Sequence, residues 1–183
     1  MIRRLMTVGA FALCVGIITI QGVRIRALQD RLEDDTNRGA LPLGSAVPDF
    51  NAENIAGVRE TITFAEDDRK TILYIFSPHC VWCARNSKSL SALSAALSPR
   101  YRVIGLSLDP DGVSEYVAAH DISFPVYTNI SESTRSAFNL GPTPETIVVD
   151  RDGTVVQAWV GAFVGSTKGR VERFFSIRLP DPS

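Results

Sequence analysis

The sequence predicts an α/β fold in which a mixed sheet carries helices on both faces. Two observations predict it. After residue 43, apolar segments of strand character alternate with helical segments in the order β-β-β-α-β-α-α-β-β-α. In addition, one apolar strand leads directly into a helix whose start carries Cys80 and Cys83. With 183 residues, 45% of them hydrophobic, the chain can bury one sizeable domain and still hold an additional segment.

The N-terminal segment 1–23 is expected to be a transmembrane helix that anchors the protein. Arg3 and Arg4 precede residues 5–23, which contain no charged side chain. A helix of that length rises about 28 Å, close to the thickness of the hydrocarbon core of a bilayer. A cleaved signal peptide is the alternative, but the end of the apolar run is a poor match to an A-x-A-like cleavage site. We therefore favour an uncleaved anchor, in which Cys14 is an inert apolar residue.

Three further segments follow the anchor. Residues 24–42 are strongly charged and are expected to form a stalk or linker, which glycine and proline at 39–44 bring to an end. Residues 43–178 are expected to form the globular domain. Residues 179–183 contain two prolines and are expected to be a flexible tail.

Within the domain, the hydrophobic pattern predicts each element in turn. Strands are expected where β-prone residues run together or alternate, and helices where apolar residues recur every three to four positions. The expected strands are 47–50, 60–64, 71–76, 101–108, 146–150 and 154–160, and residues 125–127 are a candidate extended piece. The expected helices are 80–98, 113–120, 131–138 and 168–177. Ser131 is a candidate N-cap, and residues 150–153 are typical of a hairpin turn.

The spacing of Cys80 and Cys83 predicts thiol–disulfide chemistry. The unpaired N–H groups and the dipole at a helix N-terminus stabilise a thiolate on Cys80, which makes it the expected nucleophile. Cys83 lies one turn further on the same face and is the expected resolving residue. A structural zinc site usually needs about four ligands, and a structural disulfide usually belongs to a cysteine-rich chain. Only three cysteines are present, so both alternatives are disfavoured.

Two side chains beside the cysteines are candidate modulators. His79 directly precedes the nucleophile, where a protonated imidazole would favour the thiolate, although an ordinary exposed turn residue is an equal alternative. Trp82 lies between the cysteines and is a candidate for contact with substrates, with a plain surface aromatic as the alternative.

A second candidate part of the site is distant in sequence. Thr143 and Pro144 stand immediately before an apolar strand. Bonds that precede proline are the ones that readily adopt the cis form, which is usually found in tight functional turns. A cis bond at Pro144 would turn the backbone of Thr143 toward the cysteines, where it could pair with an extended substrate.

Taken together, these residues resemble the thioredoxin superfamily, and within it the membrane-anchored TlpA/ResA-type thiol–disulfide oxidoreductases of the wider AhpC/TSA–Redoxin group. The resemblance covers roughly residues 43–175. It is carried by Gly44-Ser45-x-x-Pro48-Asp49-Phe50, Ile75-Phe76-Ser77-Pro78-x-Cys80-x-x-Cys83, Val103–Asp109 and Gly141-x-Thr143-Pro144-x-Thr146-x-Val148-x-Asp150-x-Asp152-Gly153. It implies a thioredoxin-like sheet, Cys80 and Cys83 as the redox pair, and Pro144 as a cis-proline.

The sequence also departs from this family in four respects. His79 stands where a tryptophan is frequent, and the dipeptide between the cysteines is Val81-Trp82 rather than a pair that ends in proline. Tyr74 falls near the position of the buried acid of thioredoxin, and Asn86 replaces an acid found in some relatives. The sequence therefore supplies no evident proton-transfer partner for the cysteines.

The expected function is reduction of protein disulfides by a membrane-tethered enzyme that cycles between the Cys80–Cys83 dithiol and disulfide. No cofactor beyond this redox-active disulfide is expected, and no metal. The expected partners are protein thiol or disulfide substrates, with cytochrome c maturation as one candidate process, and a membrane or periplasmic electron donor. A net charge of −1 offers no footprint for nucleic acid. The expected location is the bacterial inner membrane, with the domain facing the periplasm.

Three alternatives remain open at this point. A disulfide-forming oxidase of the same fold differs only in reduction potential. A thiol peroxidase would require a Pro-x-x-x-Thr/Ser-x-x-Cys pattern, but Leu73 occupies the proline position. A copper-carrying assembly factor would need a wider cysteine spacing with a distal histidine, and His120 is the only candidate.

Overall fold

The computed structural model describes residues 16, 18–25, 39–66 and 68–181. The chain divides into two units, residues 1–36 and 37–183. In the first unit the described residues are helical. Most of the predicted anchor at 1–23 and stalk at 24–42 lies outside the described residues. Among those that are described, no helix is both long enough and apolar enough to cross a membrane.

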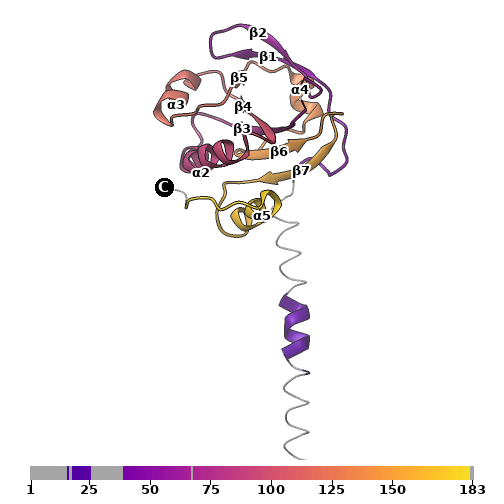
Figure 1. The fold of residues 1–183 in the computed structure, drawn as a ribbon. Helices are drawn as coiled ribbons and strands as arrows, with labels where there is room; N and C mark the ends of the chain where they lie inside the picture. The colour runs from indigo at the N-terminus through magenta and orange to yellow at the C-terminus, as the bar shows by residue number, and fades with distance from the viewer. Residues whose placement is uncertain (1–15, 17, 26–38, 67, 182–183) are drawn as a thin grey trace, which may run out of the picture. The chain divides into compact units, whose positions relative to one another are not determined.

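The second unit is built on a seven-stranded mixed sheet with strand order β2-β1-β5-β4-β3-β6-β7 (Figure 1). The strands are β1 (Phe50–Asn54), β2 (Arg59–Ile62), β3 (Lys70–Phe76), β4 (Tyr101–Ser107), β5 (Val126–Thr128), β6 (Glu145–Val149) and β7 (Val155–Val160). The central strand β3 pairs in parallel with β4 and antiparallel with β6. The mixed α/β architecture predicted from the sequence is therefore confirmed.

Helices lie on both faces of this sheet. They are α2 (Val81–Leu97), α3 (Val113–Ala119), α4 (Glu132–Ala137) and α5 (Gly165–Phe175). Residues of α2, α3 and α5 pack into one core, which we call the α2-side core. A second core lies on the other face of the sheet and contains Phe138, the residue that follows α4. Ser131 caps α4, because its side chain accepts the N–H of Thr134 at 3.1 Å.

Strand β3 divides the two cores and positions the cysteines. Its residues 72–76 are all 0% exposed. Ile72, Tyr74 and Phe76 belong to the α2-side core, while Leu73 and Ile75 belong to the opposite core. Successive side chains of a strand point to opposite faces, so a strand buried on both sides must be apolar throughout. This central strand ends directly before the turn that carries Cys80.

Most boundaries differ by one or two residues from those expected, and two differ by more. The first strand follows the expected segment 47–50 rather than filling it, and α5 begins at Gly165 instead of Lys168. The first residues of the segment 179–183, which is expected to be a flexible tail, pack against the domain. Leu179 is 6% exposed, and the carbonyl of Pro180 accepts the hydroxyl of Ser89 at 3.0 Å. An apolar residue that can reach the α2-side core orders the chain despite the neighbouring prolines.

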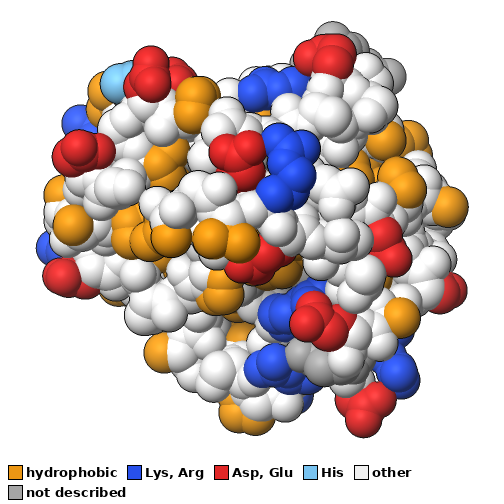
Figure 2. Space-filling model, turned by 90° about the horizontal axis from the view of Figure 1, so that it is seen from above, with side chains coloured by type: hydrophobic (Ala, Val, Ile, Leu, Met, Phe, Trp, Pro, Cys, Tyr) orange, Lys and Arg blue, Asp and Glu red, His pale blue; other side chains and the backbone are white. Residues whose placement is uncertain are grey.

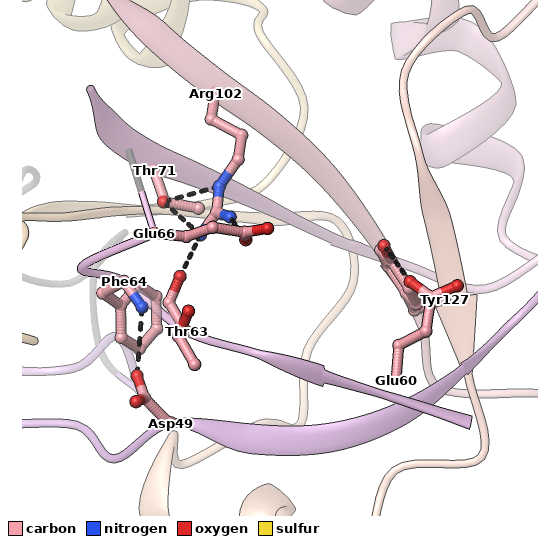
Figure 3. A network of polar contacts seen from close by, with 8 residues as sticks. All are labelled: Asp49, Glu60, Thr63, Phe64, Glu66, Thr71, Arg102 and Tyr127. Carbon is pink, nitrogen blue, oxygen red and sulfur yellow. Dashed lines mark hydrogen bonds and ion pairs between the residues drawn. The ribbon is translucent and has the colours of Figure 1, made fainter. Parts of the chain in front are cut away.

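A buried arginine ties the β2–β3 connection to strand β4 (Figure 3). The guanidinium of Arg102 donates to the carboxylate of Glu66, to the carbonyl of Thr63 and to the hydroxyl of Thr71. Its side chain is only 15% exposed, so these bonds replace most of its contact with water. On the same side of the sheet, Tyr127 donates to Glu60 at 2.9 Å.

The hairpin between β6 and β7 depends on a glycine. Gly153 has a φ of +80°, a conformation that side chains other than glycine rarely adopt. A Cβ atom added there would also lie 2.6 Å from the carbonyl oxygen of Val47.

The face of the molecule shown in Figure 2 carries acidic, basic and apolar side chains that are interspersed, so charges of one sign are not gathered in one area of it.

Candidate functional site

Cys80 lies where the central strand gives way to helix α2. Its N–H donates to the carbonyl of Ser77 at 3.1 Å, which closes the turn after β3. Cys80 is the N-cap residue of α2, and its sulfur accepts the N–H of Cys83 at 3.2 Å. Negative charge is favourable at this end of a helix, because unpaired N–H groups and the helix dipole point toward it. The fold therefore places the Cys80 sulfur where a thiolate is stabilised.

Cys83 occupies the opposite kind of environment. It is 0% exposed, whereas Cys80 is partly exposed, and both thiols are free. Burial raises the pKa of Cys83 to about 12, and its hydrogen bond with Cys80 adds to this rise. A disulfide from outside can therefore reach only the Cys80 sulfur directly, while Cys83 lies one helical turn behind it.

The turn at Thr143 and Pro144 lies against the cysteines. The peptide bond between these two residues is cis. The Cys80 thiol donates to the carbonyl oxygen of Thr143, with 3.5 Å between sulfur and oxygen. Two parts of the sequence that are 63 residues apart thus meet at one sulfur atom.

His79 is exposed beside the cysteines and has an acidic neighbour. Its Nε2 lies 3.5 Å from the Oδ2 of Asp109, which follows the end of β4. Its side chain is 66% exposed. His79 is therefore placed at the rim of the site, where it is available to solvent and to a bound partner.

The two residues between the cysteines form an exposed apolar rim. Val81 is 66% exposed and Trp82 is 50% exposed. The guanidinium carbon of Arg85 lies 5.2 Å from the centre of the Trp82 ring, a cation–π contact that holds the ring on the surface of the helix. Large apolar side chains left exposed beside a reactive group are typical of a contact surface.

A family comparison agrees with this arrangement. The model of the AhpC/TSA family matches residues 43–158, which is more than half of the chain and includes both cysteines and Pro144. The chain belongs to the AhpC/TSA family. Its resemblance to the TlpA/ResA type of the thioredoxin superfamily is likewise confirmed by the relatives described next.

Individual relatives of this AhpC/TSA-family chain share one description. It is 28% identical over 147 residues to the thiol-disulfide oxidoreductase ResA of Bacillus cereus, covering 76% of this chain and 80% of the relative. It is 24% identical over 152 residues to ResA of Geobacillus kaustophilus, covering 79% and 83%. The enzyme class predicted from the sequence, a thiol–disulfide oxidoreductase, is confirmed by these relatives.

A solved structure shows the same fold. The thiol:disulfide interchange protein DsbE of Chlorobium tepidum superposes with a TM-score of 0.64 at 17% identity. The match covers 75% of this chain and 98% of that one. The thioredoxin-like fold of this AhpC/TSA-family chain therefore contains nearly the whole of that solved structure.

The structure adds an acidic residue that sequence reasoning missed. Glu145 follows Pro144 directly and is 0% exposed, and neither of its carboxyl oxygens has a hydrogen-bond partner among the described residues. Burial raises its pKa to about 8. It lies opposite Ile75 in the antiparallel ladder, so it shares the sheet face of Ile75 and points away from the α2-side core. An acidic residue at the start of a strand that ends in three apolar residues was the signal that could have identified it.

Tyr74 falls near the position at which thioredoxin carries a buried acid, and it belongs to a network of uncharged hydrogen-bonding groups. Tyr74, from β3, accepts a hydrogen bond from the side-chain amide of Asn86 at 3.4 Å. The side-chain oxygen of Asn86 accepts the N–H of Phe163 at 2.9 Å. Asn86 lies one turn after Cys83 on α2, and both are 0% exposed. Tyr74 and Asn86, two residues at which the sequence departs from the family pattern, thus contact each other.

The described part of the chain offers no evident metal centre, since no group of three or more histidine, cysteine, aspartate or glutamate side chains is placed to hold an ion.

Proposed function

We propose that this chain is a membrane-tethered thiol–disulfide oxidoreductase that reduces disulfides of protein substrates outside the cytoplasm. In this proposal the Cys80 thiolate attacks a substrate disulfide and forms a mixed disulfide. Cys83 then attacks the Cys80 sulfur, which closes the Cys80–Cys83 disulfide and releases the reduced substrate. A membrane or periplasmic electron donor returns the pair to the dithiol form. No other cofactor takes part.

The observation that carries the proposal is the unequal environment of the two sulfurs. The Cys80 sulfur is accessible and accepts an N–H at a helix N-terminus, whereas Cys83 is fully buried behind it. A nucleophile must meet its substrate, while a resolving thiol needs to reach only the mixed disulfide. This asymmetry supports Cys80 as the attacking residue and Cys83 as the resolving one.

The surroundings of Cys80 support a protein substrate. The backbone of Thr143 lies beside the sulfur and can pair with an extended segment of a bound chain. Val81 and Trp82 supply an apolar contact on the other side. We propose that Thr143, Pro144 and Trp82 form the substrate-binding rim, and that a cysteine pair of an immature cytochrome c is one candidate substrate.

Trapping tests the proposed roles. In a Cys83→Ser variant the mixed disulfide cannot be resolved, so substrates should accumulate covalently bound through Cys80. The Cys80→Ser variant is the matched control and should trap none. If the control traps partners while Cys83→Ser does not, the two roles are assigned the wrong way round.

The direction of electron flow follows from the reduction potential of the Cys80–Cys83 pair. A value near about −270 mV, as in thioredoxin, supports a reductase, whereas a value near about −120 mV supports the disulfide-forming oxidase. The tether is tested separately by fractionation. The full chain should remain with membranes after alkaline extraction, and a chain that begins at residue 43 should be released.

A further inference from the structure

Two buried tyrosines share the core that contains Cys83. Tyr74 comes from β3 and is 0% exposed, and Tyr116 comes from α3 and is 6% exposed. Their rings stack on Phe76, with centroid distances of 5.9 Å for Tyr74 and 5.0 Å for Tyr116. A phenol buried in an apolar core normally has a partner for its hydroxyl group. Each of the two hydroxyl groups in this core is therefore expected to have a hydrogen-bond partner.

Their hydrogen bonds leave two donors unused. The oxygen of Tyr74 accepts the amide of Asn86, a bond that does not use the proton of the phenol. The amide cannot turn to take that proton without losing its other contact, because its oxygen is held by the N–H of Phe163. The hydroxyl of Tyr116 has no hydrogen-bond partner among the described residues. Two O–H donors thus lie in the same core as the Cys83 thiol.

Cys83 is the group that needs such donors. It must become a thiolate to attack the mixed disulfide, yet burial raises its pKa to about 12. Among the described buried residues the only carboxylate is Glu145, and it points to the other face of the sheet. Among the described residues, no buried carboxylate is therefore placed to exchange a proton with Cys83.

The electrostatic surroundings agree with donors that stay protonated. Burial, followed by the charge of a Cys83 thiolate, raises the pKa of both Tyr74 and Tyr116. The charge of a Cys80 thiolate also raises the pKa of both tyrosines. The ring of His120 contacts the ring of Tyr116, with 4.4 Å between their centroids. A phenol that keeps its proton can donate to an anion but cannot remove a proton from a thiol.

We propose that the hydroxyl groups of Tyr74 and Tyr116 donate hydrogen bonds to the sulfur of Cys83 when it becomes a thiolate, and so enable a fully buried cysteine to resolve the mixed disulfide. This proposal rests on the proposed function. In the step, Cys83 releases its proton to solvent and its sulfur bonds to the Cys80 sulfur. The bond between Cys80 and the substrate breaks, and its electron pair leaves with the substrate sulfur, which takes a proton from solvent. Cys83 is oxidised, the substrate sulfur is reduced, and both phenols keep their protons.

The experiment separates attack from resolution. The reduced full chain, with Cys14→Ser so that only two thiols react, is mixed in a stopped-flow instrument with dithiobisnitrobenzoate. This aromatic disulfide releases one coloured thiolate when Cys80 attacks and a second when Cys83 resolves. Two kinetic phases are therefore expected, and their rates are followed as a function of pH.

Tyr74→Phe and Tyr116→Phe should each slow the second phase by about tenfold, and the double variant by about a hundredfold, as expected for loss of hydrogen bonds to a charged group. The rate–pH curve of that phase should move to higher pH, while the first phase stays unchanged. Tyr127→Phe is the matched control, because its hydroxyl binds Glu60 and its side chain packs on the opposite core.

An unchanged second phase in the double variant would overturn the proposal. So would an equal slowing of both phases, because a role in structure alone moves them together. If the first phase is absent when both tyrosines are present, the proposed function fails and not the role of the phenols.

Discussion

The side-chain oxygen of Asn86 accepts the backbone N–H of Phe163 at 2.9 Å, which joins the helix that carries the cysteines to the segment after β7. Both residues are 0% exposed, so no water replaces this bond. Asn86 also donates to Tyr74. One amide therefore holds the helix, the central strand and the segment that leads to α5 in a single arrangement.

Replacing Asn86 should destabilise the fold. In Asn86→Leu the N–H of Phe163 stays buried without an acceptor, which costs about 1–3 kcal/mol. Asn86→Asp keeps an acceptor for this N–H and should lose less. Urea unfolding measures both, with the exposed Asn51→Ala on β1 as the control. A stability of Asn86→Leu equal to that of the unaltered protein would contradict the role assigned to the bond.

Glu145 should make stability fall as the pH rises. Its ordinary pKa is 4.5 and burial raises it to about 8 in the folded protein. Between these values the folded state keeps a proton that the unfolded chain has lost, so the free energy of unfolding decreases with pH and the loss is complete above about pH 8. The total effect is on the order of a few kcal/mol.

Glu145→Gln removes the titrating group and should flatten this dependence. Urea midpoints measured at several pH values from about 5 to 9 should fall for the unaltered protein and stay nearly level for the variant. The exposed Glu115→Gln on α3 serves as the control and should keep the original slope. Parallel curves for the unaltered protein and Glu145→Gln would show that the buried carboxyl does not titrate in this range.

Arg102 should contribute more to stability than an exposed arginine. Arg102→Met leaves the carbonyl of Thr63 and the hydroxyl of Thr71 without their donor (Figure 3), and a loss of about 1–3 kcal/mol is expected. Arg59→Met removes an exposed partner of Glu53 and should leave the urea midpoint nearly unchanged. Similar midpoints for the two variants would argue against a special role for the buried network.

The predicted modulating role of His79 has a measurable consequence. A positively charged imidazole beside Cys80 would attract its thiolate, so His79→Ala should slow alkylation of Cys80 by iodoacetamide by about two- to fivefold. Asp109→Asn removes the competing carboxylate 3.5 Å away and should not slow the reaction. Equal rates for His79→Ala and the unaltered protein at all pH values would identify His79 as an ordinary turn residue.

Local chemistry explains why so much of the fold could be predicted. The strand 71–76 is apolar at every position but its first, and this pattern suits only a strand buried on both faces. Ser131 before α4 and Gly153 between β6 and β7 are residues that their local backbone requires. The burial of Leu179 was not predicted, because two nearby prolines say nothing about a core that lies close in space.

By itself, the sequence determined the element order, the placement of Cys80 and Cys83 at the start of a helix, and the turn at Pro144, because each depends on neighbouring residues. Only the tertiary structure decided which groups surround the sulfurs. It placed Tyr74 and Tyr116 in the core of Cys83, and it placed Glu145 on the other face of the sheet. These relations depend on strand register and on helix packing, which join residues far apart along the chain and which no local pattern encodes.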